Sequence, residues 1–191
     1  MQRLLLDFAQ LANERLSQIA LLLNNCDAGT PSESCADSQG LMLYQQLERS
    51  VPAGWIARTM EAGPFAWTYI LRPSHQICQG WKIHVSCSGY EFANCWLIVS
   101  EYCFGNDLPF KFPANSRGIE MLNSGLAGDL QIGKIFTVYT SSADPPLRHL
   151  DDLHNRLPIQ SGPIVPSDLR LHTESAVSCR CLLYTSRWPN D

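Results

Sequence analysis

Apolar residues recur at helical spacing over residues 3–23 and give way to small polar residues over 26–40. The second segment, CDAGTPSESCADSQG, has the composition of a flexible linker. We therefore expect an N-terminal helix and a linker over residues 1–40, and a compact domain over 41–180. The apolar stripe of the helix comprises Leu4, Leu5, Phe8, Leu11, Ala12, Leu16, Ile19 and Leu23.

Beyond Leu41, short β-prone runs alternate with helical segments. This order, without an internal repeat, predicts an α+β fold with a mixed or antiparallel sheet flanked by helices. Extended runs are expected at Phe65–Leu71 after a turn at Gly63-Pro64, and at Trp81–Ser86, Leu108–Phe112, Gly133–Thr140 and Ala176–Tyr184. Helices are expected at 90–104 before Gly105-Asn106, from Asn115 or Ser116 to Leu122, and from Asp144-Pro145-Pro146 to about Arg156.

Composition and charge exclude several classes of function. A formal net charge of −4 argues against holding nucleic acid by bulk electrostatics. No apolar stretch approaches the roughly 18 residues of a membrane span, and no export signal opens the chain. The eight cysteines include no C-x-x-C pair, which argues against structural zinc. We expect reduced, mostly buried thiols in a cytoplasmic protein, with no metal or cofactor.

Only three lysines occur, against eleven arginines, and each lysine lies in or beside an expected strand: Lys82, Lys111 and Lys134. Lysine is uncommon in half-buried strands. One explanation is that edge strands use lysine to prevent aggregation. The other is chemical, because Lys82 and His84 share a strand face. An amine and an imidazole on one face can polarise a carbonyl group and donate a proton.

A series of motifs, in order, resembles the N-terminal lyase domain of class III/IV lanthionine synthetases. The resemblance covers about residues 41–180 and extends to bacterial effector phosphothreonine lyases. It implies a phosphothreonine lyase-like fold and removal of phosphate from a side chain by β-elimination, without water or metal. The motifs are Gln79–Ser86, Pro109–Phe112, Leu122–Ser124, Gly133-Lys134, Thr137–Tyr139, Gly162-Pro163, Ser167–Arg170 and Cys179-Arg180.

The resemblance also implies roles for individual residues. Lys111 is the expected base, His84 the general acid, and Lys82 with Tyr139 the pair that stabilises an enolate-like oxygen. A lysine base at neutral pH needs its pKa lowered by roughly 3 units, about 4 kcal/mol. Burial between Phe110 and Phe112 and repulsion from Lys82 are the expected causes. Phosphate binding is expected from Arg180, Arg170 and Lys134, and His172 stands where relatives often carry arginine.

One residue departs from the family pattern. Asp129 occupies a position ten residues before Tyr139 where relatives have a phosphate-binding arginine. A carboxylate about 4 Å from a phosphate would be repelled by about 4 kcal/mol per unit charge. The leading hypothesis is therefore a lyase acting on phosphoserine or phosphothreonine. The alternative is a catalytically impaired, peptide-binding pseudo-lyase. A free-standing effector-type lyase is a third possibility, disfavoured by the motifs.

The resemblance implies partners as well. The expected substrate is a phosphorylated precursor peptide, and kinase and cyclase domains are expected in the full-length protein. Residues 181–186 (CLLYTS) match one reading frame of a common sequencing adapter. We therefore expect residues 181–191 to be a non-native tail. His149 and His154, near Asp151 and Asp152, are interpreted as solvated helix surface rather than a metal site.

Overall fold

The computed structural model describes residues 51–75, 80–141, 146–157, 162–170 and 172–182. These residues belong to a compact unit that begins at Ser50. The expected N-terminal helix, the linker and residues 183–191 of the expected tail lie outside the described residues, as does Asp144.

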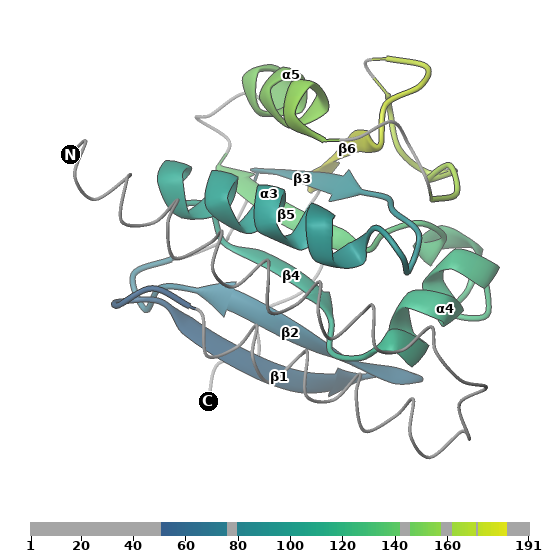
Figure 1. Cartoon of the computed structure of the whole chain (residues 1–191), viewed down its shortest axis with the longest axis horizontal. Helices are drawn as coiled ribbons and strands as arrows, with labels where there is room; N and C mark the ends of the chain where they lie inside the picture. The colour runs from purple at the N-terminus through teal and green to yellow at the C-terminus, as the bar shows by residue number, and fades with distance from the viewer. Residues whose placement is uncertain (1–50, 76–79, 142–145, 158–161, 171, 183–191) are drawn as a thin grey trace, which may run out of the picture. The chain divides into compact units, whose positions relative to one another are not determined.

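Six strands form one sheet in the order β1-β2-β4-β5-β3-β6, and every described pairing is antiparallel. Figure 1 shows α3 lying across one face of this sheet, with α5 next to β6. The predicted α+β class, with a sheet flanked by helices, is confirmed. The strands are β1 Ile56–Ala62, β2 Phe65–Leu71, β3 Gly80–Val85, β4 Phe110–Pro113, β5 Phe136–Ser141 and β6 Val177–Leu182. The helices are α3 Phe92–Asn106, α4 Ser116–Ser124 and α5 Pro146–Arg156, with a short 3-10 turn, η1, at Asp129–Gln131.

The core lies between α3 and one face of the sheet. Phe92 of α3 stacks on Phe136 of β5 with ring centroids 5.2 Å apart, and Trp96 meets Phe112 of β4 edge-on at 6.5 Å. Aromatic pairs of this kind stabilise a fold by about 0.5–1.5 kcal/mol beyond the area they bury. The same sheet face carries Ile70, Ile83, Val85, Phe110, Phe136 and Val138, all of which are buried.

Because side chains alternate along a strand, packing this face against α3 leaves the other face available for polar groups.

Most expected elements are present, with shifted ends. The strand at Phe65–Leu71 has the expected bounds, and Asn115 caps α4 by accepting a hydrogen bond from the Gly118 amide at 2.9 Å. The helix α3 continues through Gly105-Asn106 and ends at Asn106. Asp107, the residue that caps it, has a left-handed backbone at φ 56°. The strand expected from Gly133 begins later, at Phe136. β6 continues to Leu182, two residues beyond Arg180.

The strand β1 was not predicted from the sequence. This edge strand pairs with β2 through a two-residue turn at Gly63-Pro64, where Gly63 takes a positive φ of 81°. Its residues, IARTMEA, are exposed or half-buried throughout. They therefore lack the alternation of buried and exposed positions that identifies a half-buried strand.

The expectation that His149 lies on a solvated surface is wrong, because His149 of α5 is fully buried. Its Nδ1 lies 2.7 Å from the hydroxyl oxygen of Tyr102 in α3, and that hydroxyl donates to Asp152 at 3.1 Å. His154 stacks on His172, with ring centroids 4.2 Å apart. These contacts join α5 to α3 and to the loop before β6. Among the described residues, no group of three or more acidic, histidine or cysteine side chains is arranged to hold a metal ion.

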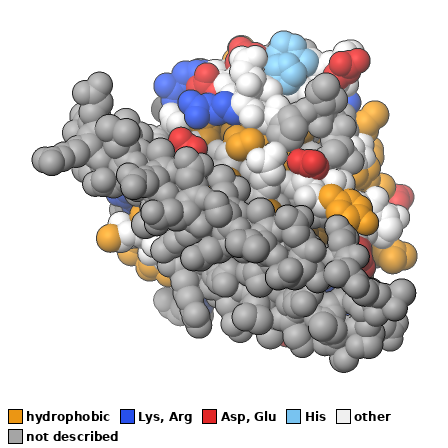
Figure 2. All heavy atoms as spheres, viewed as in Figure 1, with side chains coloured by type: hydrophobic (Ala, Val, Ile, Leu, Met, Phe, Trp, Pro, Cys, Tyr) orange, Lys and Arg blue, Asp and Glu red, His pale blue; other side chains and the backbone are white. Residues whose placement is uncertain are grey.

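Four cysteines that the structure describes are buried free thiols: Cys87, Cys95, Cys103 and Cys179. Cys181 is free and exposed. No helix in the described part of the chain combines the length and apolar character needed to cross a membrane. Figure 2 shows exposed apolar side chains along the right-hand margin, on the side where α4 lies in Figure 1.

Candidate active site

Cross-strand pairing aligns the expected functional residues on the sheet face opposite α3. One row, which we call the first row, crosses all six strands as Arg58, Tyr69, Lys111, Thr137, His84 and Ser178. A second row, two residues along the strands, contains Tyr139, Lys82 and Arg180. Residues two apart in a strand share a face. All four expected catalytic residues and Arg180 therefore lie on one surface.

Lys111 is a half-buried amine surrounded by aromatic rings. Its Nζ lies 3.9 Å from the centroid of the Trp67 ring and 5.5 Å from that of Tyr69. Burial lowers the pKa of Lys111 to about 7, and positive charge at Lys82, Arg180 and Lys134 adds to the effect. The expected burial between Phe110 and Phe112 is wrong, because those rings lie on the core face. The neighbours in β2 bury the amine instead.

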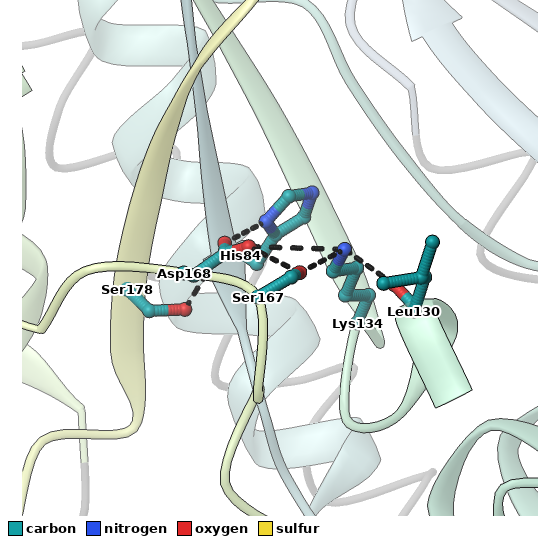
Figure 3. A network of polar contacts seen from close by, with 6 residues as sticks. All are labelled: His84, Leu130, Lys134, Ser167, Asp168 and Ser178. Atoms are coloured by element: carbon teal, nitrogen blue, oxygen red, sulfur yellow. Dashed lines mark hydrogen bonds and ion pairs between the residues drawn. The ribbon is translucent and has the colours of Figure 1, made fainter.

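His84 is buried and held by a carboxylate from a distant loop. Its Nδ1 is hydrogen-bonded to the Asp168 side chain, which also accepts a 3.4 Å hydrogen bond from the Ser178 hydroxyl (Figure 3). Burial lowers the pKa of His84 to about 4 against the opposing effect of Asp168. The imidazole is therefore neutral at pH 7, and an Nδ1–H that donates to Asp168 leaves Nε2 as the available nitrogen.

Asp168 remains ionised beside that imidazole. Burial alone would raise the pKa of its carboxyl group, but the hydrogen bond and charge of His84, together with Ser167 and Lys134, lower it below its usual value. The Ser167 hydroxyl donates to Asp168 at 2.9 Å. An ionised carboxylate on Nδ1 fixes both the orientation and the tautomer of the histidine ring.

Lys134 lies at the other end of this network. Its buried Nζ donates to the Leu130 carbonyl and, at 2.9 Å, to Ser167, and it lies 3.7 Å from an oxygen of Asp168 (Figure 3). The ammonium group thus joins the η1 turn to the loop that carries Asp168. Lys134 was expected to bind phosphate, but these contacts are with the protein itself.

Lys82, Tyr139 and Arg180 are direct neighbours across β5, β3 and β6. Lys82 Nζ lies 5.7 Å from the centroid of the Tyr139 ring. Burial lowers the pKa of Lys82, and Arg180 lowers it further against an opposing effect of Asp168. Burial also raises the pKa of Tyr139, so that its hydroxyl stays protonated and can donate a hydrogen bond.

The remaining expected phosphate ligands lie apart from these rows. Arg170 follows Leu169, which forms an isolated bridge with Cys179 of β6, and its guanidinium donates to the Thr173 carbonyl at 2.8 Å. His172 is exposed and lies 3.3 Å from an Asp151 oxygen of α5. Of the expected cations, Arg180 is the one that the strand pairing places beside Lys82.

Asp129 opens the η1 turn and is exposed. Among the described residues, the charged groups that shift the pKa values of Lys82, His84 and Lys111 do not include Asp129. The η1 turn instead directs a backbone carbonyl, that of Leu130, at Lys134.

Residues 43–191 match the protein family described as "RamC, N-terminal domain", and the chain belongs to this family. It is 30% identical over 130 residues to the probable SapB synthase of Streptomyces coelicolor, an alignment that covers 67% of this chain and 13% of that protein. The chain thus spans a small part of this curated relative's length.

Solved structures of phosphothreonine lyases are similar in fold. SpvC, the effector protein from Salmonella, matches with a TM-score of 0.51 at 16% identity, over 89% of this chain and 90% of that chain. OspF, the type III effector from Shigella flexneri, matches over 91% and 92% with a TM-score of 0.46 at 18% identity. The SpvC match confirms the predicted phosphothreonine lyase-like fold. The family match confirms the predicted resemblance to the lyase-like domain of lanthionine synthetases.

Two features of the site were not predicted from the sequence. Asp168 lies within the motif Ser167–Arg170, but nothing in the sequence indicated a role for it. A loop aspartate 84 positions from its histidine leaves no periodic signal, and only the fold brings them together. The rings of Trp67 and Tyr69, which surround Lys111, were likewise read only as part of a strand.

Proposed function

We propose that this domain is a phosphoserine/phosphothreonine lyase, which removes phosphate by β-elimination and leaves a dehydroamino acid. The observation that carries the proposal is the half-buried amine of Lys111 on the sheet face that also carries His84, Lys82 and Tyr139. Burial lowers the pKa of this amine to about 7. At that pKa about half of the amines are unprotonated at pH 7. At the ordinary value of 10.5, roughly one in 3,000 would be. A base of this strength suits removal of a weakly acidic Cα proton.

The bond changes follow the first row. Lys111 takes the Cα proton, and the electron pair of that C–H bond forms the Cα=Cβ double bond. The Cβ–O bond breaks, and its electron pair leaves with the phosphate. His84 Nε2 donates a proton to the departing oxygen. Lys111 and His84 are separated by Thr137, so their Cα atoms are about 10 Å apart. Two long side chains can converge across that spacing on one substrate residue.

His84 needs a proton before it can act as the acid. Burial lowers its pKa to about 4, so the imidazole is neutral at pH 7. A bound phosphate carries a charge of about −1.5 to −2. That negative charge raises the pKa of a nearby imidazole, because it stabilises the imidazolium. We propose that substrate binding is coupled to protonation of His84, so that the acid forms only when a leaving group is present.

The second row supplies the remaining electrostatics. As the Cα proton leaves, negative charge develops on the substrate carbonyl oxygen. We propose that Lys82 and the protonated hydroxyl of Tyr139 stabilise this charge. Arg180, beside Lys82, is proposed to bind the phosphate, because a guanidinium group can contact two phosphate oxygens at once. We propose that Lys134 and Arg170 hold the loop before β6 rather than bind phosphate, because their side chains contact the protein itself.

We propose a phosphorylated precursor peptide as the substrate. The similarity to a probable SapB synthase supports this choice. That relative is much longer than this chain. By the same reasoning, a kinase domain would phosphorylate the peptide and a cyclase domain would consume the dehydroamino acids. The alternative of an impaired, peptide-binding pseudo-lyase depended on a carboxylate next to the phosphate. The exposed position of Asp129 does not favour it.

Mass spectrometry of a phosphopeptide incubated with the full chain tests the proposal. Elimination removes the elements of phosphoric acid, whereas hydrolysis leaves a product that is one water heavier. We expect the lighter product from the wild type and none from Lys111→Ala or Lys111→Arg. Alanine has no basic group, and the guanidinium group of arginine stays protonated. The matched control is Arg117→Ala, which alters an exposed residue of α4. Unchanged phosphopeptide bound to the wild-type protein would instead support the pseudo-lyase.

A further inference from the structure

The first row of the active-site face extends beyond the residues that the chemistry uses. From Lys111 it continues through Tyr69 of β2 to Arg58 of β1, at the edge of the sheet. The Tyr69 ring lies 5.5 Å from Lys111 Nζ, so the surface between the two cations is aromatic. Arg58 is exposed, and no described residue forms an ion pair with it.

The register fixes how far Arg58 lies from the base. Neighbouring strands are about 4.8 Å apart, so two strand spacings place the Arg58 and Lys111 Cα atoms about 10 Å apart. An extended peptide advances about 3.3 Å per residue. Consider a peptide that crosses this face from Lys111 toward β1. The residue two or three positions from the reacting residue then lies within reach of the Arg58 side chain.

The charge of Arg58 determines what it can bind there. Its neighbours on this face of β1 are Ile56 and Met60, which carry no charge. The acidic residue of the strand, Glu61, lies an odd number of positions away and points to the other face. The guanidinium group thus offers planar donors for a carboxylate or a phosphate.

We propose that Arg58 is a specificity residue that binds an anionic side chain two or three residues from the reacting phosphoserine or phosphothreonine. The inference rests on the proposed lyase function and specifies its substrate: a peptide that is acidic, or phosphorylated a second time, on one side of the reacting residue. The aromatic surface of Tyr69 carries the intervening peptide.

Peptides with one central phosphoserine test this selectivity. One set carries glutamate at a single position two or three residues before or after the phosphoserine. A second set carries another phosphoserine there, and a third carries lysine or alanine. We expect kcat/KM to be about threefold to fivefold higher for the favoured glutamate peptide than for its alanine counterpart, the size of an exposed ion pair. We expect a larger gain for the second phosphate, because it carries about −1.5 to −2 charges whereas a carboxylate carries one.

Variants separate this role from a general effect. Arg58→Ala should remove the preference and leave the rate on the alanine peptide unchanged, and Arg58→Glu should transfer the preference to the lysine peptide. Arg117→Ala is the control and should keep the wild-type preference. An edge-strand arginine that only prevents aggregation would give equal preferences in wild type and Arg58→Ala, which would overturn the proposal.

Binding measured with Lys111→Ala keeps the two proposals apart. If this variant binds the favoured acidic peptide more tightly, and Arg58→Ala in the same background abolishes that difference, Arg58 is a specificity residue even if the wild type performs no elimination. If the wild type eliminates phosphate at the same rate from acidic, neutral and basic peptides, the lyase proposal is supported and the proposed role of Arg58 is wrong.

Discussion

Replacing Lys111 with methionine should abolish elimination and make the protein more stable at low pH. The fall of the Lys111 pKa from 10.5 to about 7 corresponds to about 5 kcal/mol, the cost of keeping a charged amine in this environment. Methionine keeps most of the side-chain volume and removes the charge. The proposed base is therefore a source of instability that the variant lacks.

The pH dependence separates this effect from changes in packing. The folded-state pKa of Lys111 lies below the unfolded-state value, so the unfolded chain binds more protons between pH 7 and pH 10.5. Wild-type stability therefore rises with pH across that window relative to the variant, and below pH 7 the cost is complete. Between pH 6 and pH 9 the stability advantage of Lys111→Met should shrink by about 2.5 kcal/mol.

Urea unfolding followed by circular dichroism at several pH values measures this difference, because urea leaves the ionic strength unchanged. Most other groups titrate alike in both proteins and cancel. Arg117→Met is the matched control, and its stability relative to the wild type should not vary over the same range. A difference between wild type and Lys111→Met that stays constant from pH 6 to pH 9 would refute the reasoning. It would mean that the amine has an ordinary pKa in the folded protein.

Three other substitutions test the site. Asp168→Asn should lower kcat at least about 100-fold by releasing the His84 ring. The wild type loses stability as acid protonates Asp168, because the pKa of this residue is lowered in the fold. Asp168→Asn should lack this pH-dependent part of the stability. Lys134→Met should reduce stability by about 3 kcal/mol, because Asp168 loses a buried partner, with little change in phosphopeptide KM. A raised KM with unchanged stability would restore Lys134 as a phosphate ligand. Asp129→Arg should change kcat/KM less than about threefold, and a tenfold rise would show that the η1 turn approaches the phosphate.

Local sequence patterns predicted the elements that pack against the core. The run Phe65–Leu71 and the helix capped by Asn115 were predictable because their burial or capping follows from neighbouring residues. β1 was not, because an exposed edge strand lacks an alternating pattern. The shared face of Lys82 and His84 follows from the period of a strand.

The rest of the site depends on contacts between distant parts of the chain. Asp168 meets His84 across 84 positions, and Trp67 reaches Lys111 through the pairing of β2 with β4. Sequence periodicity contains no information about such pairings. The error about Phe110 and Phe112 has the same origin. These residues flank Lys111 along the chain, but alternation turns them to the opposite face, and the amine instead lies against Trp67 and Tyr69 of β2, two strands earlier in the chain.

The position of β3 in the sheet affects how the protein folds during synthesis. β3 carries Lys82 and His84 and pairs with β5 and β6, both of which follow it in the chain. Fifty residues separate Val85, the end of β3, from Phe136, the start of β5. At roughly 5–20 residues per second, β3 waits about 3–10 s on the ribosome for its first partner. Its second partner, β6, is the last of the described strands in the chain and carries Arg180. The row of Tyr139, Lys82 and Arg180 is therefore complete only after β6 has paired, and one edge of β3 stays open between the synthesis of β5 and that of β6.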